Sequence, residues 1–192
     1  MQKVLIINGA EERTIAPGKF NESMLMVAQS LLSSKAEVKI TRVRDHYQVT
    51  EEQNKILWAD TIIFQFPVYW FSVPSSLKKY FDDVYAHGLF FGNAKRYGEG
   101  GFLTDKRYLL STTWNAPVEA FSYINGLFEH TTPDDLLASV HFTQQYIGMQ
   151  RLPSFAAFNI ITQPNVDYWQ ECWQSHLKLH LLNSSSESKE KL

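Results

Sequence analysis

Several apolar runs in this sequence do not alternate with polar residues, and this feature limits the possible folds most strongly. Val4 to Ile7 is uninterrupted, and the segments 61–66 and 108–112 are largely apolar in the same way. A strand with one face in water alternates, whereas a continuous run is typical of a strand buried on both faces. These segments therefore predict strands inside a sheet that is covered on both sides.

Helical patterns separate the strands. From Asn21 onward, apolar residues recur on one helical face, and the Asn21 side chain is the expected cap of that helix. Repeated strand–helix units place parallel strands in one sheet with helices on both faces. We therefore predict an α/β fold with a five-stranded parallel sheet. Its other elements are expected as strands at 37–41 and 155–161 and as helices at 50–58, 73–84, 133–146 and 166–181.

Composition excludes several classes of protein. The net charge is −2 and no Lys/Arg cluster exceeds a pair, so a nucleic-acid surface is not expected. A single cysteine, Cys172, excludes an internal disulfide and a cysteine-based metal site. There is no signal-peptide pattern and no apolar stretch near the roughly 18 residues of a membrane span. We expect a cytoplasmic protein with one domain over residues 1–183 and a disordered polar tail over residues 184–192.

Ligands of such sheets bind beyond the carboxyl ends of the strands, which directs attention to three loops. The first, residues 9–20, leads to a helix N-terminus, where free amides and a partial positive charge suit a phosphate. It contains neither the G-x-x-x-x-G-K-[ST] nor the G-x-G-x-x-G pattern. The loop is therefore either a phosphate cradle made of backbone amides or an ordinary strand–helix connection.

The second loop, residues 67–71, follows a buried strand and carries Tyr69, Trp70 and Phe71 without any charge. These aromatic residues either pack against a partner chain or wall a flat, apolar ligand. The third loop, residues 112–118, supplies hydroxyl groups, an amide and a tryptophan. Together the three loops favour a flavin nucleotide as ligand.

The stretch "QFPVYWFSVPSSLKKYFDDV" resembles the flavin-loop signature of the NAD(P)H quinone reductase superfamily, whose fold is flavodoxin-like. The blocks "LIINGA", "LWAD", "YGEGG", "TWNAPVEAF" and "GMQRLPSF" are similar to the modulator of drug activity B family. These blocks span residues 4 to about 158. The resemblance implies a homodimeric FAD enzyme that reduces quinones with NADPH or NADH.

The resemblance also implies the cofactor-binding residues. The FAD phosphates and ribose would lie on the first loop, the isoalloxazine between residues of the second and third loops, and one tyrosine would reach the cofactor from the long loop of residues 86–105. The implied residues are Ala16, Pro17, Gly18, Lys19, Phe20, Asn21, Glu22, Ser23, Val68, Tyr69, Trp70, Phe71, Tyr97, Thr113, Trp114, Asn115 and Ala116.

This chain departs from the related enzymes in two respects. The stretch "APGKF" has no hydroxyl for a phosphate, so backbone amides, Asn21 and Ser23 would have to bind it. "WNAPVEAF" lacks the tyrosine and histidine that are proposed to relay a proton in mammalian quinone reductases, so we assign no catalytic side chain. His176 and His180 stand four residues apart, but no carboxylate or cysteine cluster completes a metal site, and none is predicted.

Two other functions remain open from the sequence. One is a non-catalytic regulatory flavoprotein that binds a partner and senses redox state. The other is an interaction domain whose aromatic loop only forms a dimer. The colour of the purified protein, and the bleaching of that colour by NADPH, would distinguish these alternatives from an enzyme.

Overall fold

A parallel sheet forms the centre of the computed structural model, which describes residues 1–13 and 18–182. The proposed tail and the first-loop residues Ala16 and Pro17 lie outside the described residues. The strand order is β2-β1-β3-β4-β5, and β6 also pairs with β4. Every strand pairing is parallel, which confirms the predicted α/β sheet. The strands are β1 (Gln2–Asn8), β2 (Ala36–Arg42), β3 (Thr61–Pro67), β4 (Arg107–Thr113), β5 (Gln150–Arg151) and β6 (Phe155–Ala157).

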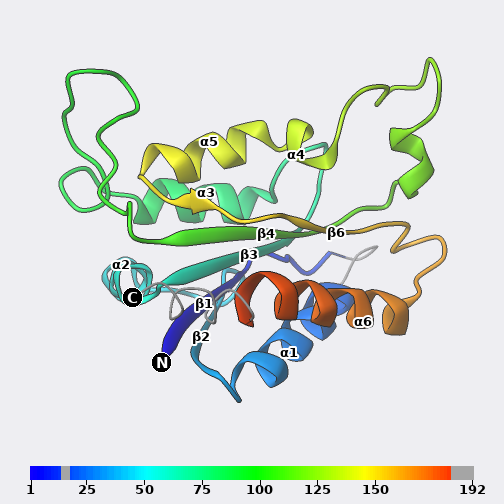
Figure 1. Ribbon diagram of the computed structural model, residues 1–192, viewed down its shortest axis with the longest axis horizontal. Helices are drawn as coiled ribbons and strands as arrows, with labels where there is room; N and C mark the ends of the chain where they lie inside the picture. Colours follow the sequence, from blue (N-terminus) through cyan, green and yellow to red (C-terminus); the bar gives the residue numbers. More distant parts are fainter. Residues whose placement is uncertain (14–17, 183–192) are drawn as a thin grey trace, which may run out of the picture.

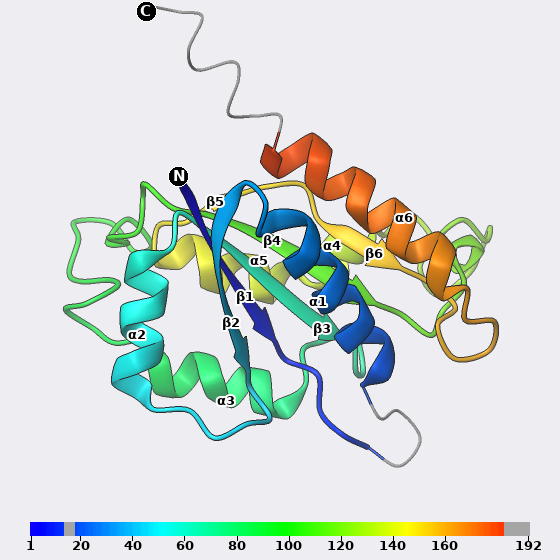
Figure 2. The ribbon, with the colours of Figure 1, turned by 90° about the horizontal axis from the view of Figure 1, so that it is seen from below.

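Helices cover both faces of this sheet, and each face has its own apolar core (Figures 1 and 2). On one face, α2, α3 and α5 pack over side chains such as Leu5 and Phe64. On the other face, α1 and α6 pack over Val4 and Ile6. Because alternate residues of β1 enter opposite cores, the strand needs apolar residues at every position. The helical elements are α1 (Lys19–Leu32), α2 (Val49–Trp58), α3 (Ser75–Val84), η1 (Val118–Phe121), α4 (Pro133–Leu136), α5 (Ala138–Tyr146), α6 (Val166–Leu177) and the π-helical η2 (Lys178–Leu182).

The fifth strand position differs from the sequence prediction. We expected one strand over 155–161, but β6 ends at Ala157, and the two-residue β5 precedes it beside β4. Pro153 lies between β5 and β6 and has no backbone N–H to donate to a neighbouring strand. Asn159 has a φ of 57°, in the left-handed region, which turns the chain out of the sheet. The expected strand is therefore short, and the residues after it form a separate loop.

Two helix starts also differ from the prediction. The N-cap of α1 is Gly18, with a φ of 75°, and not Asn21, which lies inside the first turn. A glycine at this position avoids the steric cost that a side chain incurs at positive φ. The N-cap of α3 is Pro74, so this proline precedes the first helical turn instead of belonging to it.

Parallel pairing brings the carboxyl ends of β1, β3 and β4 to one edge of the sheet. Asn8 is in register with Gln65, and Pro67 is in register with Thr113. The loops that follow these residues therefore begin side by side. This edge, which also holds the N-terminus of α1, contains the candidate site.

Candidate functional site

A buried polar network joins the N-terminus of α1 to the ends of β3 and β4. The Asn21 side-chain amide donates a hydrogen bond to Thr113 Oγ1 at 3.0 Å. The Gln65 side-chain amide donates to the backbone carbonyl of Asn21. Both donors are at most 2% exposed. The first turn of α1, whose leading amides have no acceptor within the helix, is thus fixed relative to the sheet edge.

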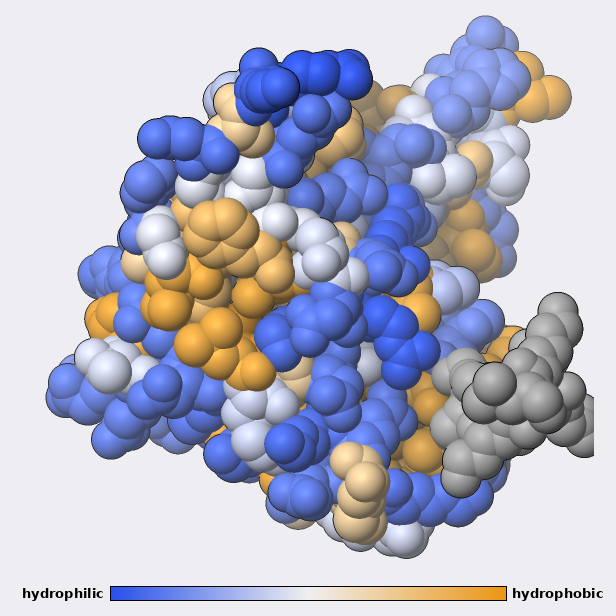
Figure 3. Space-filling view, turned by 60° about the vertical axis from the view of Figure 1, so that its left-hand side comes forward, coloured by the Kyte–Doolittle hydropathy of each residue, from blue (hydrophilic) through white to orange (hydrophobic). Residues whose placement is uncertain are grey.

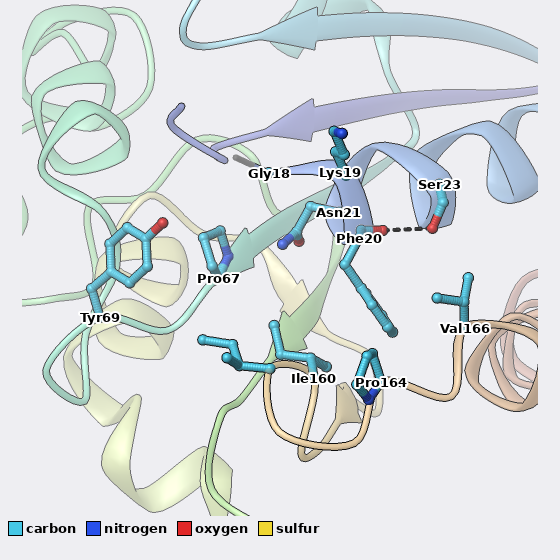
Figure 4. A pocket seen from close by; sticks show the side chains of 11 residues that line it. Gly18, Lys19, Phe20, Asn21, Ser23, Pro67, Tyr69, Ile160, Pro164 and Val166 are labelled. Carbon is cyan, nitrogen blue, oxygen red and sulfur yellow. Dashed lines mark hydrogen bonds between the residues drawn. The ribbon is translucent and has the colours of Figure 1, made fainter. Parts of the chain in front are cut away.

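A mostly apolar cavity of about 390 Å³ opens at this position (Figure 4). One side is the start of α1, where the Phe20 ring extends toward Pro164 and the Asn21 side chain points toward Pro67. The opposite side is formed by Tyr69 from the turn after β3. The lining residues are Gly18, Lys19, Phe20, Asn21, Ser23, Pro67, Tyr69, Ile160, Ile161, Pro164 and Val166.

Six of the residues implied by the family resemblance line this cavity. They are Gly18, Lys19, Phe20, Asn21, Ser23 and Tyr69. Glu22, by contrast, accepts hydrogen bonds from Arg42, with a distance of 3.1 Å from Nε. This contact, against the effect of partial burial, lowers the pKa of Glu22, and the nearby Arg44 lowers it further. Glu22 therefore fixes α1 to β2 and does not face the cavity.

The turn from Tyr69 to Ser72 has an unusual backbone. Tyr69 and Ser72 exchange two backbone hydrogen bonds of 3.0 Å, and the two residues between them, Trp70 and Phe71, have φ values of 48° and 62°. A two-residue turn with both central φ values positive normally contains glycine or asparagine. Each residue with a side chain in this region costs about 1–2 kcal/mol. Such backbone strain is commonly found at functional sites.

The side chains of this turn lie near the cavity but do not all line it. Trp70 is 92% exposed, so it is not part of the core of this chain. Phe71 is 44% exposed and makes an edge-to-face contact with Phe128, with ring centroids 5.5 Å apart. Val68, which leads into the turn, packs against the core on the α3 side of the sheet. Only Tyr69 contributes directly to the cavity wall.

Trp114 is among the residues expected to edge the flavin ring, and its side chain is packed inside the chain. It is 3% exposed, its indole N–H donates to Thr112 Oγ1 at 2.9 Å, and its ring stacks with Phe158. Its backbone amide donates to Ala157. In the described part of the chain, the amides of Asn115 and Ala116 have no such acceptor. This loop can therefore offer these two backbone amides to a ligand, while the Trp114 ring is packed against Phe158.

Tyr97 lies elsewhere in the same chain. It is 95% exposed and, with Tyr146 and Phe142, lines a second hollow of about 600 Å³ between α5 and the loop of residues 86–105. Figure 3 shows the end of the molecule that carries this loop, where apolar side chains gather in one patch. The two cavities share no lining residue, so a single copy of the chain does not bring Tyr97 to the first one.

Two polar atoms around the first cavity are buried without a partner in the described structure. They are the side-chain oxygen of Asn21 and the hydroxyl of Tyr69. Burial raises the pKa of Tyr69, although the neighbouring Arg13 opposes this effect, so the hydroxyl is protonated at neutral pH. A buried polar group without a partner is unfavourable by about 1–3 kcal/mol. Both atoms belong to residues that line the cavity, so its walls contain hydrogen-bonding groups that no described protein group satisfies.

Two features of this cavity were not predicted from the sequence: one of its walls, and the contact between Tyr69 and the first loop. Ile160, Ile161, Pro164 and Val166 form the wall, but we assigned the first two to a strand and the last to a helix stripe. Arg13 lies over the Tyr69 ring at 4.2 Å, a contact between residues far apart in the sequence. No local pattern indicates either feature.

Metal and membrane sites have no support in the part of the chain that the structure describes. His176 and His180 are neighbours, with ring centroids 4.4 Å apart, but within residues 1–13 and 18–182 no three His, Cys, Asp or Glu side chains form a group that could hold a metal ion. Among the same residues, no helix has both the length and the apolar character that a membrane crossing requires.

Comparison with known proteins gives the family. Residues 2–177 match the family model described as flavodoxin-like fold. The chain is 32% identical over 186 residues to NADPH:quinone oxidoreductase MdaB of Haemophilus influenzae, covering 91% of this chain and 97% of that protein. The protein belongs to the flavodoxin-like fold family, in the group that includes MdaB.

Solved structures agree with this assignment. A putative quinone reductase from Klebsiella pneumoniae is 25% identical, with a TM-score of 0.75, and the match covers 93% of this chain and 84% of that one. The general stress protein 14 of Treponema denticola, solved in complex with FMN, has a TM-score of 0.70 at 18% identity, with 93% and 97% covered. This last likeness concerns the fold alone.

Proposed function

We propose that the protein is a flavin-dependent oxidoreductase that carries two electrons from NADPH or NADH to quinones, with FAD as its flavin. The observation that carries this proposal is the cavity between α1 and Tyr69, which is apolar but contains two buried polar atoms without partners. Its position beyond the carboxyl ends of β3 and β4 is where ligands of such sheets bind. The likeness to MdaB, named an NADPH:quinone oxidoreductase, supports the choice of substrates.

The residues at this edge fit the parts of a flavin nucleotide. The start of α1, with Gly18 as its cap, provides backbone amides and a partial positive charge for phosphates. The Asn21 oxygen and the Tyr69 hydroxyl suit the hydroxyl groups of a ribityl chain, because one accepts and the other donates. The free amides of Asn115 and Ala116 suit the polar edge of an isoalloxazine ring.

The chemistry that a bound flavin supplies is two-electron hydride transfer. The protein's own contribution is to orient the reactants and to exclude water. Tyr69, Trp70 and Phe71 would wall a flat ring, and exposed Trp70 offers a surface against which a nicotinamide or a quinone can stack. Among the residues that the structure describes, Lys19 and Tyr69 have the ionisable side chains that line the cavity, and we assign neither as a proton donor. Donor and quinone would use the same place in turn.

We propose FAD rather than FMN because the cavity extends past the start of α1. Pro164 beside the Phe20 ring and Val166 beyond it form an apolar wall, which suits a second, adenine-containing half of the cofactor (Figure 4). Acid release of the flavin from the purified protein, followed by chromatography, is expected to yield FAD. Recovery of FMN alone would refute this part of the proposal, while leaving the flavin fold in place.

We also propose a homodimer. The patch around Tyr97 and Phe142 is exposed and apolar, and Ile124 and Leu127 are each more than 80% exposed on the segment after β4. Exposed apolar surface of this kind usually marks an interaction site. A two-fold pair would also allow Tyr97 of one copy to approach the site of the other. Sedimentation at micromolar concentration should show about twice 22.2 kDa, and a purely monomeric species would refute the pairing.

A further inference from the structure

Two charged residues of the first loop, Glu11 and Arg13, make contacts on either side of the strained turn. Arg13 reaches its start, and Glu11 reaches the first turn of α3, three residues beyond its end. The two residues are also bound to each other, since Arg13 donates from Nε at 3.1 Å and from Nη2 at 2.9 Å to one oxygen of Glu11. They form a continuous connection between the first and second loops of the candidate site.

The contact at the start of the turn is between a guanidinium and an aromatic face. The Arg13 carbon Cζ lies 4.2 Å from the centre of the Tyr69 ring, which is within the range of a cation–π interaction. The same tyrosine forms part of the cavity wall, and its N–H and C=O close the turn against Ser72. Arg13 therefore contacts the residue that both lines the cavity and closes the turn.

The contact at the other end is made by the second oxygen of Glu11. It accepts a hydrogen bond from the Ser76 backbone amide at 2.8 Å and one from the Ser75 hydroxyl at 3.1 Å. Although burial alone would raise the pKa of Glu11, these hydrogen bonds and those from Arg13 lower it to about 2. The carboxylate is therefore charged at neutral pH, as its contacts with Arg13 require.

Between these two contacts lie Trp70 and Phe71, whose positive φ values are unfavourable for residues with side chains. Such a conformation persists only when its surroundings fix it. The hydrogen bonds of the turn itself join only Tyr69 and Ser72. The Arg13 contact holds Tyr69, and the Glu11 contacts hold the start of α3. Together they are placed to prevent the turn from relaxing to an unstrained backbone.

We propose that Arg13 is a positioning residue for the cofactor: through Tyr69 and Glu11 it holds the aromatic turn in its strained form and ties it to the loop that precedes α1. This inference rests on the proposed flavin site, which it extends by a residue outside the binding motifs. Its consequence is that flavin retention depends on Arg13, even though Arg13 does not line the cavity.

The test compares Arg13→Met, which keeps most of the side-chain length, with wild type. The rate at which FAD leaves the purified holoprotein on dilution is followed by the fluorescence of the released flavin. We expect Arg13→Met to release FAD about two- to tenfold faster, the factor that loss of one cation–π contact implies. Chymotrypsin, with fragments identified by mass, should also cut between residues 69 and 71 faster in the variant. The thermal midpoint should stay near that of wild type, because the Arg13 side chain is 49% exposed.

A matched control and a double-mutant cycle isolate the effect. Arg96→Met removes another exposed arginine, paired with Glu99 at 3.1 Å on the loop of residues 86–105, and should change neither rate. In a Tyr69→Leu background, Arg13→Met should have a clearly smaller effect on release, because only the connection through Glu11 is then left to lose. Release and cleavage rates equal to those of wild type, or an undiminished effect in the Tyr69→Leu background, would overturn the inference. If wild type retains no flavin, the proposed function fails, and the cleavage rates still test whether Arg13 holds the turn.

Discussion

Replacing Trp114 with alanine is expected to reduce the free energy of unfolding by about 3–5 kcal/mol, the usual effect of truncating a large buried aromatic residue. The indole is 3% exposed, stacks with Phe158 and meets Phe121 edge-on with centroids 5.7 Å apart. Its N–H also donates to Thr112, a contact that alanine cannot make. For a chain of this size, such a loss lowers the melting temperature by roughly 6–20 °C.

Urea unfolding, monitored by circular dichroism, measures this change. Tyr123→Ala provides the control, because Tyr123 belongs to the same segment after β4 but is 54% exposed. A surface truncation of this kind should change stability by less than about 0.5 kcal/mol. If Trp114→Ala instead unfolds like wild type and only loses flavin, then the Trp114 ring contacts the ligand, and its packing against Phe121 and Phe158 contributes little to stability.

Replacing Trp70 should have the opposite pattern: a large effect on flavin and little effect on the fold. Trp70 is 92% exposed, so Trp70→Ala removes almost no core packing. If the indole walls the flavin or its reaction partner, its loss weakens binding by about 1–3 kcal/mol, judged from aromatic stacking on planar bases. Affinity for FAD, or the Michaelis constant for the quinone, should therefore change about ten- to a hundredfold.

The backbone conformation of Trp70 allows a second, independent test of the role of this residue. Its φ of 48° is strained for alanine but not for glycine. Trp70→Gly should therefore be more stable than Trp70→Ala by about 1–2 kcal/mol, while both variants bind flavin equally poorly. Thermal melting of the two flavin-free variants checks this difference. If both variants are much less stable than wild type, the Trp70 side chain contributes to the packing of the chain despite its exposure.

The elements of the fold could be predicted because their signals are local. The apolar run from Val4 to Ile7 and the helical stripe of α1 each contain the information for one element, and parallel pairing follows from their alternation. The fifth strand was less predictable. Pro153 and the left-handed Asn159 divide and end it, and their effect depends on where β4 stops.

The site could be predicted only in part, because its walls come from distant segments. The start of α1 and Tyr69 were found through motifs next to strand ends. The burial of Trp114 was not, because Phe121 and Phe158, which cover it, belong to later segments whose path the sequence does not indicate. The contact of Arg13 with Tyr69 likewise depends on how two loops meet at the sheet edge.

We propose that the cavity between α1 and the strained turn holds a flavin that carries electrons from NADPH or NADH to quinones. The most direct test of this proposal is the absorbance of the purified protein during anaerobic addition of NADPH, followed by a simple naphthoquinone. We expect a yellow protein that bleaches within seconds and regains its colour with the quinone, with parallel initial-rate plots in the steady state. A protein that binds flavin but is not bleached would be a regulatory flavoprotein, and one that stays colourless even with added FAD would have no flavin site.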